Sequence, residues 1–149
     1  MAFDQLLVAG NISASGMSAE RRRMEVIANN IANAYSTRSE SGGGPYRRRE
    51  ILFESVMNDR LDGGQSTSPS SGLGGVRVVG EIDDESPLQR VHNPGHPDAD
   101  DAGFVSMPNV SIPMEMVNLM TASRAYEANL KVLQTLRQQL EQTLTLLRY

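Results

Sequence analysis

The amino-acid sequence predicts an α+β protein in which long N- and C-terminal helices pair as a coiled-coil-like inner domain. A small antiparallel β module and flexible Gly/Ser loops are inserted between them. Apolar residues recur at heptad spacing from Phe3 to Tyr35 and again from Met116 to Leu147. The middle of the chain instead contains short alternating segments and glycine-rich runs. We therefore expect an inner domain of residues 1–36 and 111–149, and an outer domain of residues 37–110.

The N-terminal helix has a regular seam but a weak helical propensity. Steps of four and three residues from Phe3 reach Leu7, Gly10, Ala14, Met17, Arg21, Met24, Ala28, Ile31 and Tyr35. The glycines at 10 and 16 and the serines at 13, 15 and 18 together cost several kcal/mol relative to alanine, at roughly 0.5 to 1 kcal/mol each. We expect this helix to be disordered in an isolated chain and to fold on assembly.

The C-terminal helix contains better helix formers and a seam of larger residues. Its seam consists of Met116, Leu119, Ser123, Tyr126, Leu130, Leu133, Arg137, Leu140, Leu144 and Leu147. Pro113 suits the first turn, where Glu115 lies near the positive end of the helix dipole. A second apolar row contains Ala125, Val132, Leu136 and Leu146. One partner helix cannot cover both rows, so we expect a bundle with helices from several subunits.

The residues between the helices predict four short strands, at 46–56, 76–82, 88–92 and 103–107. Two loops, 36–44 and 62–75, are rich in glycine and serine and should be mobile. The turn at 93–95 and Pro108 bound the later strands.

Charge is distributed unevenly along the 149 residues, which carry a net charge of −4 and no cysteine. Ten acidic residues and three arginines lie in residues 51–112, so the middle should be a solvated outer module. A pI of about 5.2 and the absence of tryptophan argue against general nucleic-acid binding. The chain begins without a basic segment, and no run is long and apolar enough for a membrane span, so we expect neither a cleaved signal nor a spanning helix.

No motif supports an enzyme, a metal site or a cofactor. His92 and His96 have the spacing of a helical metal site, but Pro94 lies between them and prevents a helix. The acidic run at 98–103 lacks the ligands of a calcium loop. The glycines at 72–75 lack the helix of a dinucleotide-binding turn.

Two arginine triplets, 21–23 and 47–49, could contact phosphate. On a helix, the first triplet spreads its charges around the axis, as expected for a solvated or salt-bridging face. On a strand, alternation directs Arg48 to one face and Arg47 and Arg49 to the other. Neither triplet therefore predicts a coherent phosphate-binding patch.

Several runs resemble one family. The run ANNIANA (28–34), at the end of the first helix, resembles the asparagine-rich motif of the rod and hook axial proteins of the bacterial flagellum. The runs GPYR (44–47), NPGHP (93–97), MPNV (107–110), EMVNLMTASRAYEAN (115–129) and VLQT (132–135) are similar to its proximal-rod members and occur in the family's order. This resemblance covers most of the chain.

The resemblance implies a structural subunit of the basal-body proximal rod, with no catalytic activity and no cofactor. Such a subunit polymerises through its terminal helices, transmits torque and lines the export channel. It reaches the periplasm through the flagellar type III export apparatus without signal cleavage. Its partners would be copies of itself, other rod proteins, the junction of the MS ring with the rod, and the distal rod, but neither nucleic acid nor a small-molecule substrate. Another rod or hook subunit, or a cytoplasmic helical export chaperone or adaptor, is an alternative.

We expect the assembly interface to combine seam residues with the asparagines of the 28–34 run. These residues are Leu7, Ala14, Met17, Met24, Ala28, Asn29, Asn30, Ile31, Asn33, Leu119, Tyr126, Asn129, Leu130, Leu133, Leu140 and Leu144. The asparagine amides could satisfy backbone groups where the helix ends against neighbouring chains. Alternatively, Asn33 caps the C-terminus of its own helix.

Overall fold

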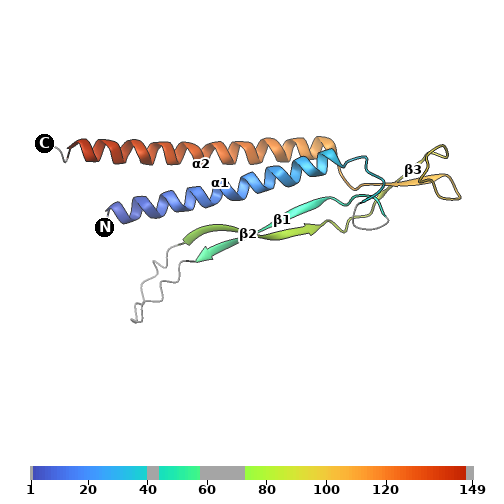
Figure 1. Ribbon diagram of the computed structural model, residues 1–149, viewed down its shortest axis with the longest axis horizontal. Coiled ribbons are helices and arrows are strands. Elements are labelled where there is room, and N and C mark those ends of the chain that lie inside the picture. The colour runs from blue at the N-terminus through green and yellow to red at the C-terminus, as the bar shows by residue number, and fades with distance from the viewer. Residues whose placement is uncertain (1, 40–43, 58–72, 147–149) are drawn as a thin grey trace. The chain divides into compact units, whose positions relative to one another are not determined.

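A computed structural model describes residues 2–39, 44–57 and 73–146. The predicted α+β fold is confirmed: the chain begins and ends with a long helix, and four strands lie between the two helices in sequence (Figure 1). The elements in order are α1 (Ala2–Ala32), β1 (Arg49–Met57), β2 (Leu73–Asp83), β3 (Gln89–His92), β4 (Phe104–Met107) and α2 (Ile112–Leu146). Most of the two predicted Gly/Ser loops, 36–44 and 62–75, lies outside the described residues, so their expected mobility stays a prediction.

The chain divides into two compact units. Unit 1 comprises Met1–Arg22, Phe53–Val79 and Ser123–Tyr149, whereas unit 2 comprises Arg23–Leu52 and Gly80–Ala122. Each unit therefore contains part of both helices and part of the β1–β2 pair. Within each unit, α1 lies between α2 and β1–β2 (Figure 1).

The two helices pack along heptad rows that match the predicted seams at every second position. On α1 the buried and half-buried row is Leu6, Gly10, Ser13, Met17, Glu20, Met24, Ile27, Ile31 and Ala34. On α2 it is Glu115, Leu119, Ala122, Tyr126, Asn129, Leu133, Leu136 and Leu140. At the alternate positions, the more buried residue is the one immediately before the predicted residue. Examples are Ser13 instead of Ala14 and Asn129 instead of Leu130. Adjacent residues lie about 100° apart on a helix, so the predicted seam was wrong there by one step around the axis.

Small residues bring the helices of unit 1 close together. A Cβ atom added at Gly10 would lie 3.9 Å from Leu133 and 4.0 Å from Leu136. A Cβ atom at Gly16 would lie 3.1 Å from the Asn129 amide. The glycines that weaken α1 as an isolated helix therefore permit close packing against α2.

A second face of α1 contacts the sheet in unit 1. The backbone N–H of Val76 donates to the Ser15 hydroxyl at 3.1 Å, and that hydroxyl donates to the Ile12 carbonyl at 2.7 Å. Gly75 has a φ of +105°, and a Cβ there would lie 2.2 Å from Ser15 Oγ. Only glycine fits at this approach of β2 to α1.

The four strands form two separate two-stranded sheets, β1–β2 and β3–β4, rather than the single module expected. β3 and β4 are antiparallel, with Gln89 opposite Met107 and His92 opposite Phe104. In unit 2, Ala34, Tyr46 and Val110 form a small buried core against which Ile112 packs. Neither helix, within the described residues, is long and apolar enough to cross a membrane.

Candidate functional site

The most completely buried polar residue of α1 is Asn30, which lies in unit 2 with no exposed surface. Its amide nitrogen donates to the Arg49 carbonyl at 2.9 Å and to Glu115 Oε2 at 3.0 Å. Its amide oxygen accepts from the Arg49 backbone N–H and from the Tyr46 hydroxyl, both at 2.9 Å. Both donors and both lone pairs of the amide are used, so Asn30 joins α1, β1 and α2 within one chain.

Glu115 is the second member of this network and is 1% exposed. Its Oε1 accepts from Arg48 Nε at 2.8 Å and from Asn118 Nδ2 at 3.2 Å, while Oε2 accepts from Asn30. The residue also lies in the first turn of α2, where the helix dipole favours a negative charge. Its buried carboxylate therefore has a cation, two amides and a helix terminus to compensate for lost water.

Arg48 supplies the positive charge of the network. Its guanidinium also pairs with Glu50 and, at 3.4 Å, with Asp84. Burial opposes the charged form, but the hydrogen bonds to Glu115 and Glu50 outweigh it and raise the pKa of Arg48 above its ordinary value. Arg48 therefore remains a cation at every physiological pH.

Backbone groups around Arg48 complete the network. The Arg48 N–H donates to Asn109 Oδ1 at 2.8 Å, and the Asn109 amide donates to the Asp84 carbonyl at 3.0 Å. The Asp84 N–H in turn donates to the Arg48 carbonyl at 2.7 Å. We call Asn30, Tyr46, Arg48, Asn109 and Glu115 the polar hub. It joins three segments of unit 2 that are far apart in sequence: the end of α1, residues 46–48 and residues 109–115.

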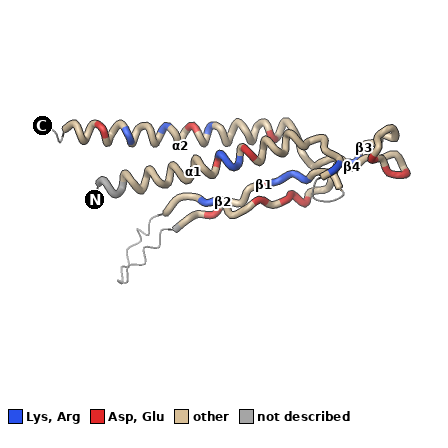
Figure 2. Tube along the Cα trace, viewed as in Figure 1, with Lys and Arg blue, Asp and Glu red and all other residues tan. Residues whose placement is uncertain are grey.

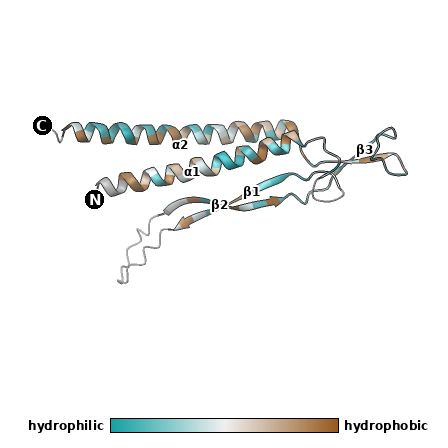
Figure 3. Ribbon diagram, viewed as in Figure 1, coloured by the Kyte–Doolittle hydropathy of each residue, from teal (hydrophilic) through white to brown (hydrophobic). Residues whose placement is uncertain are grey.

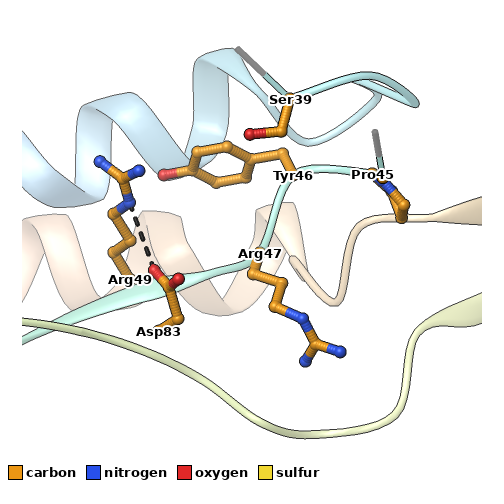
Figure 4. Close-up of a pocket in the computed structure, with 7 residues that line it drawn as sticks. Ser39, Pro45, Tyr46, Arg47, Arg49 and Asp83 are labelled. Atoms are coloured by element: carbon orange, nitrogen blue, oxygen red, sulfur yellow. Dashed lines mark ion pairs between the residues drawn. The ribbon is translucent and has the colours of Figure 1, made fainter. Parts of the chain in front are cut away.

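Figure 4 shows the side of the polar hub where Tyr46 points its hydroxyl toward α1. Burial raises the pKa of Tyr46, so its phenol stays protonated and donates to Asn30. A cavity of about 160 Å³ beside it is lined by Ser39, Gly44, Pro45, Tyr46, Arg47, Arg49 and Asp83. Arg49 and Asp83, which both line this cavity, form an ion pair at 3.4 Å. Their charges are therefore paired with each other within the chain.

The other asparagines of the 28–34 run have different environments. Asn29 is exposed, whereas Asn33 is half-buried and its amide donates to the Asn29 carbonyl at 3.0 Å. The backbone N–H of Asn33 donates to the same carbonyl. The Asn33 side chain therefore bonds a carbonyl of the last turn of its own helix, but without the positive φ of an asparagine C-cap, so the capping interpretation stays a prediction. The intramolecular role of Asn30 matches neither interpretation.

The expected interface residues fall into three groups. Met17, Met24, Ile31, Leu119, Tyr126, Asn129, Leu133 and Leu140 are half-buried along the seam. Leu7, Ala14, Ala28, Leu130 and Leu144 are exposed beside it. Asn29, Asn30 and Asn33 belong to the turn at the end of α1. No partner chain is present, so contact between chains stays a prediction for all of them.

The arginine and histidine patterns are explained by contacts within the chain. Arg48 points inward while Arg47 and Arg49 are exposed, so the predicted alternation is confirmed. His92 stacks edge-on against Phe104 at 5.0 Å between ring centroids. His96 Nδ1 accepts the backbone N–H of Asp98 at 3.1 Å. Within the described residues, no group of three or more His, Cys, Asp or Glu side chains could hold a metal ion.

The sequence contained one signal for the polar hub that heptad counting missed. Glu115 occupies a core position of the α2 row that continues through Leu119 and Ala122. A carboxylate at a core position predicts a buried partner of opposite charge. The sequence could not identify Arg48 as that partner, because 67 residues separate Arg48 from Glu115.

Family models for flagellar rod proteins match both ends of the chain. The model described as "Flagella basal body rod protein" matches residues 11–37. The model described as "Flagellar basal body rod FlgEFG protein C-terminal" matches residues 101–146. The two matches cover most of α1 and α2 and include Asn30, Asn109 and Glu115 of the polar hub.

Full-length relatives give the same result. The flagellar basal-body rod protein FlgC of Salmonella typhimurium is 39% identical over 141 residues, covering 95% of this chain and 97% of that protein. FlgC of Borreliella burgdorferi is 40% identical over 92% of this chain and 94% of its own length. FlgC of Agrobacterium fabrum is 34% identical, with 98% of each chain covered.

Proposed function

This chain belongs to the FlgC family of flagellar basal-body rod proteins, and from that premise we propose that it assembles through the exposed rows of its two terminal helices. As a structural rod subunit, it resides in the flagellar basal body and assembles with other rod components. The proposal concerns how it does so: which side chains meet neighbours, and which only hold the chain together.

The observation that carries the proposal is a row of exposed residues beside the seam on each helix. We call these the flanking rows: Leu7, Ala14, Arg21 and Ala28 on α1, continued by Tyr35 in the turn after it, and Met116, Ser123, Leu130, Arg137 and Leu144 on α2, of which only Ser123 is half-buried. Leu7 is 58% exposed and Leu144 is 56% exposed. Most of these side chains are apolar, with Arg21, Ser123 and Arg137 as interruptions. They are available to further helices because the seam leaves this side of each helix uncovered.

The seam and the flanking rows therefore have different roles in the proposal. The half-buried seam residues join α1 to α2 within one chain, while the flanking rows contact neighbouring subunits. Asn30 lies outside the proposed contact surface because its amide is fully used by the polar hub. The half-exposed leucines would each contribute roughly 1 kcal/mol on burial, so many weak contacts would sum along the rod.

We also propose the following roles for the terminal helices and for the residues between them. The terminal helices form the inner domain, transmit torque along the rod and line its export channel, while residues 37–110 face outward. The chain is exported through the type III apparatus and acts where the rod crosses the periplasm. Its neighbours include the MS-ring junction and the distal rod.

A substitution in a flanking row tests the assembly proposal. Leu144→Asp introduces a charge where a neighbouring helix would pack, whereas Gln142→Asp places the same charge on the polar face of the same turn. We expect Leu144→Asp chains to keep their helical content by circular dichroism but to be at least tenfold less abundant in purified basal bodies. Equal incorporation of the two variants would contradict the role of this row.

Fractionation addresses the remaining alternatives. A rod subunit should co-purify with basal bodies, whereas a cytoplasmic export chaperone or adaptor would remain in the soluble fraction. The FlgC relatives favour a proximal-rod subunit over another axial protein, since they match nearly the whole chain.

Hydrogen exchange tests whether folding is linked to assembly. We expect amides of α1 within unit 1 to exchange much faster in the dilute chain than those from Arg23 to Ala32, which the polar hub holds. Strong protection along the whole of α1 at low concentration would rule out disorder before assembly.

A further inference from the structure

The first turns of α2 carry an apolar patch on the side away from the seam. Met114, Val117 and Met120 are 59%, 57% and 62% exposed, and we call them the methionine patch. Farther along the same side of α2 most exposed residues are polar or charged, including Arg124, Lys131 and Gln138, until Leu146, which is 80% exposed. Apolar residues, drawn brown, occur along the whole of α2 (Figure 3), and the methionine patch is set apart because its three exposed members are neighbours on one side of the first turns.

Few charged residues lie in the part of the sequence that contains the patch. From Ala102 to Ser123 the sequence contains a single charged residue, Glu115, and that carboxylate is buried in the polar hub. A partner can cover the methionine patch without removing a charge from water. Methionine side chains are flexible and adapt to varied surfaces, and exposed apolar patches commonly mark protein contacts.

A complementary surface lies on the same chain in unit 1, at the beginning of α1. Residues 5–19 contain no charged residue, as the uncoloured first half of α1 shows (Figure 2). Leu7 and Val8 are 58% and 38% exposed there, and they adjoin the exposed small residue Ala14. Large side chains on one helix and small ones on the other permit close packing of the helix axes.

We propose that the methionine patch docks on the first turns of α1, at Leu7, Val8 and Ala14, of a second copy of this chain. This inference rests on the proposed assembly function and names the partner of one surface. The two contact surfaces are different, so each copy offers one to the next and receives one from the previous copy. Such a head-to-tail contact continues as an open helix instead of closing into a two-fold dimer, as a rod requires.

The absence of cysteine from the chain permits a direct test. Val117→Cys and Val8→Cys chains are co-expressed in cells lacking the native protein, and purified basal bodies are oxidised. We expect a disulfide-linked pair containing one chain of each kind, at least about tenfold more abundant than the pair from Val132→Cys and Val8→Cys. Val132 is a matched control because it is 44% exposed on α2 outside the patch.

Three results would overturn the docking. These are equal yields from both cysteine pairs, a predominant link between two Val117→Cys chains, or a link from Val117→Cys to a different protein. The second would indicate a symmetric contact, and the third a partner other than this chain.

Aspartate variants separate this inference from the proposed function. We expect Val117→Asp, but not Val132→Asp, to lower incorporation into basal bodies by at least about tenfold. If Val117→Asp incorporates normally, the docking is wrong while the assembly function stands. If the unsubstituted chain itself is absent from basal bodies, the proposed function fails, and the docking fails with it.

Discussion

Units 1 and 2 use the same two helices and the same strand pair, but different interactions hold them together. In unit 2 the buried Glu115 carboxylate accepts from Asn30 and Arg48, and Tyr46 and the Arg49 backbone complete the hydrogen bonds of Asn30. In unit 1 the contacts pass through glycines at 10, 16 and 75. Large apolar side chains are exposed in both units, such as Leu7 in unit 1 and Val117 in unit 2. Hydrogen bonds that are complete within one chain favour a single internal geometry, whereas an incompletely covered apolar surface favours association. The difference indicates that the interior of unit 2 is specified by its own hydrogen bonds, whereas unit 1 lacks such a network. Both units offer exposed apolar side chains to neighbours.

The strongest test of this comparison is Asn30→Ala in the polar hub. The substitution removes four hydrogen bonds and leaves Tyr46, Glu115 and the Arg49 backbone without their buried partner. We expect the free energy of unfolding of unit 2 to fall by about 3 to 5 kcal/mol. Urea unfolding followed by circular dichroism measures it. Asn29→Ala is the control, because Asn29 is exposed in the same turn and should change stability by less than about 0.5 kcal/mol.

Arg48→Met should have the next largest effect. It leaves the buried Glu115 carboxylate without its cation, and we expect a loss of about 2 to 4 kcal/mol. In the double variant with Glu115→Gln, the uncompensated charge is gone, so the combined loss should be smaller than the sum of the single losses by about 1 kcal/mol or more. Strict additivity in urea unfolding would show that the two residues do not act as a pair.

Gly75→Ala probes the corresponding contact in unit 1. The new Cβ would meet Ser15 Oγ at 2.2 Å, and the positive φ adds strain, so we expect the contact of β2 with α1 to weaken by about 1 to 2 kcal/mol. Hydrogen exchange at the Val76 amide, which donates to Ser15, should become faster while the amides of unit 2 are unchanged. Gly80→Ala is the control, since no atom lies within 4 Å of its added Cβ.

Gly10→Ala should stabilise unit 1, which is the opposite of the effect expected for Gly75→Ala. Its Cβ would lie at ordinary contact distance from Leu133 and Leu136, and alanine is the better helix former. We expect α1 in unit 1 to be stabilised by about 0.5 to 1 kcal/mol, with increased helicity by circular dichroism. A decrease in helicity would indicate that the helices are packed too closely for a methyl group.

Acid should produce the smallest effect through Asp84. Its pKa is lowered, first by the Ser86 hydroxyl and then by the Ser86 N–H and Arg48, so the folded state favours the carboxylate. The stabilisation is present above the unfolded pKa, near 4, and is lost as pH falls through the lower folded pKa. Asp84→Asn should therefore be less stable at pH 7 and show a shallower loss of stability below about pH 4. An unchanged acid titration would exclude this contribution.

The sequence predicted individual elements more accurately than their packing. Period-two alternation located all four strands, and heptad spacing located both helices. It identified Met17, Met24, Leu119 and Leu133 as seam residues, but at alternate positions it chose the neighbouring residue, such as Leu130 in place of Asn129. Heptad counting places each position by its step from the previous one, and it therefore chose Ala28 and Arg137 where Ile27 and Leu136 are the more buried residues. It cannot know that Asn129 packs against Gly16, because a glycine has no side chain to mark the contact.

By itself the sequence determined the α+β class, the two terminal helices, the intramolecular alternation of Arg47, Arg48 and Arg49, and the resemblance to rod proteins. All of these depend on local periodicity or on the order of short motifs. Only the tertiary structure revealed that Asn30, Arg48 and Glu115 form one buried network, and that the exposed apolar residues lie in rows beside the seam. Hydrogen bonding across 67 or 85 residues depends on the path of the backbone in space, and spacing along the chain carries no signal for it.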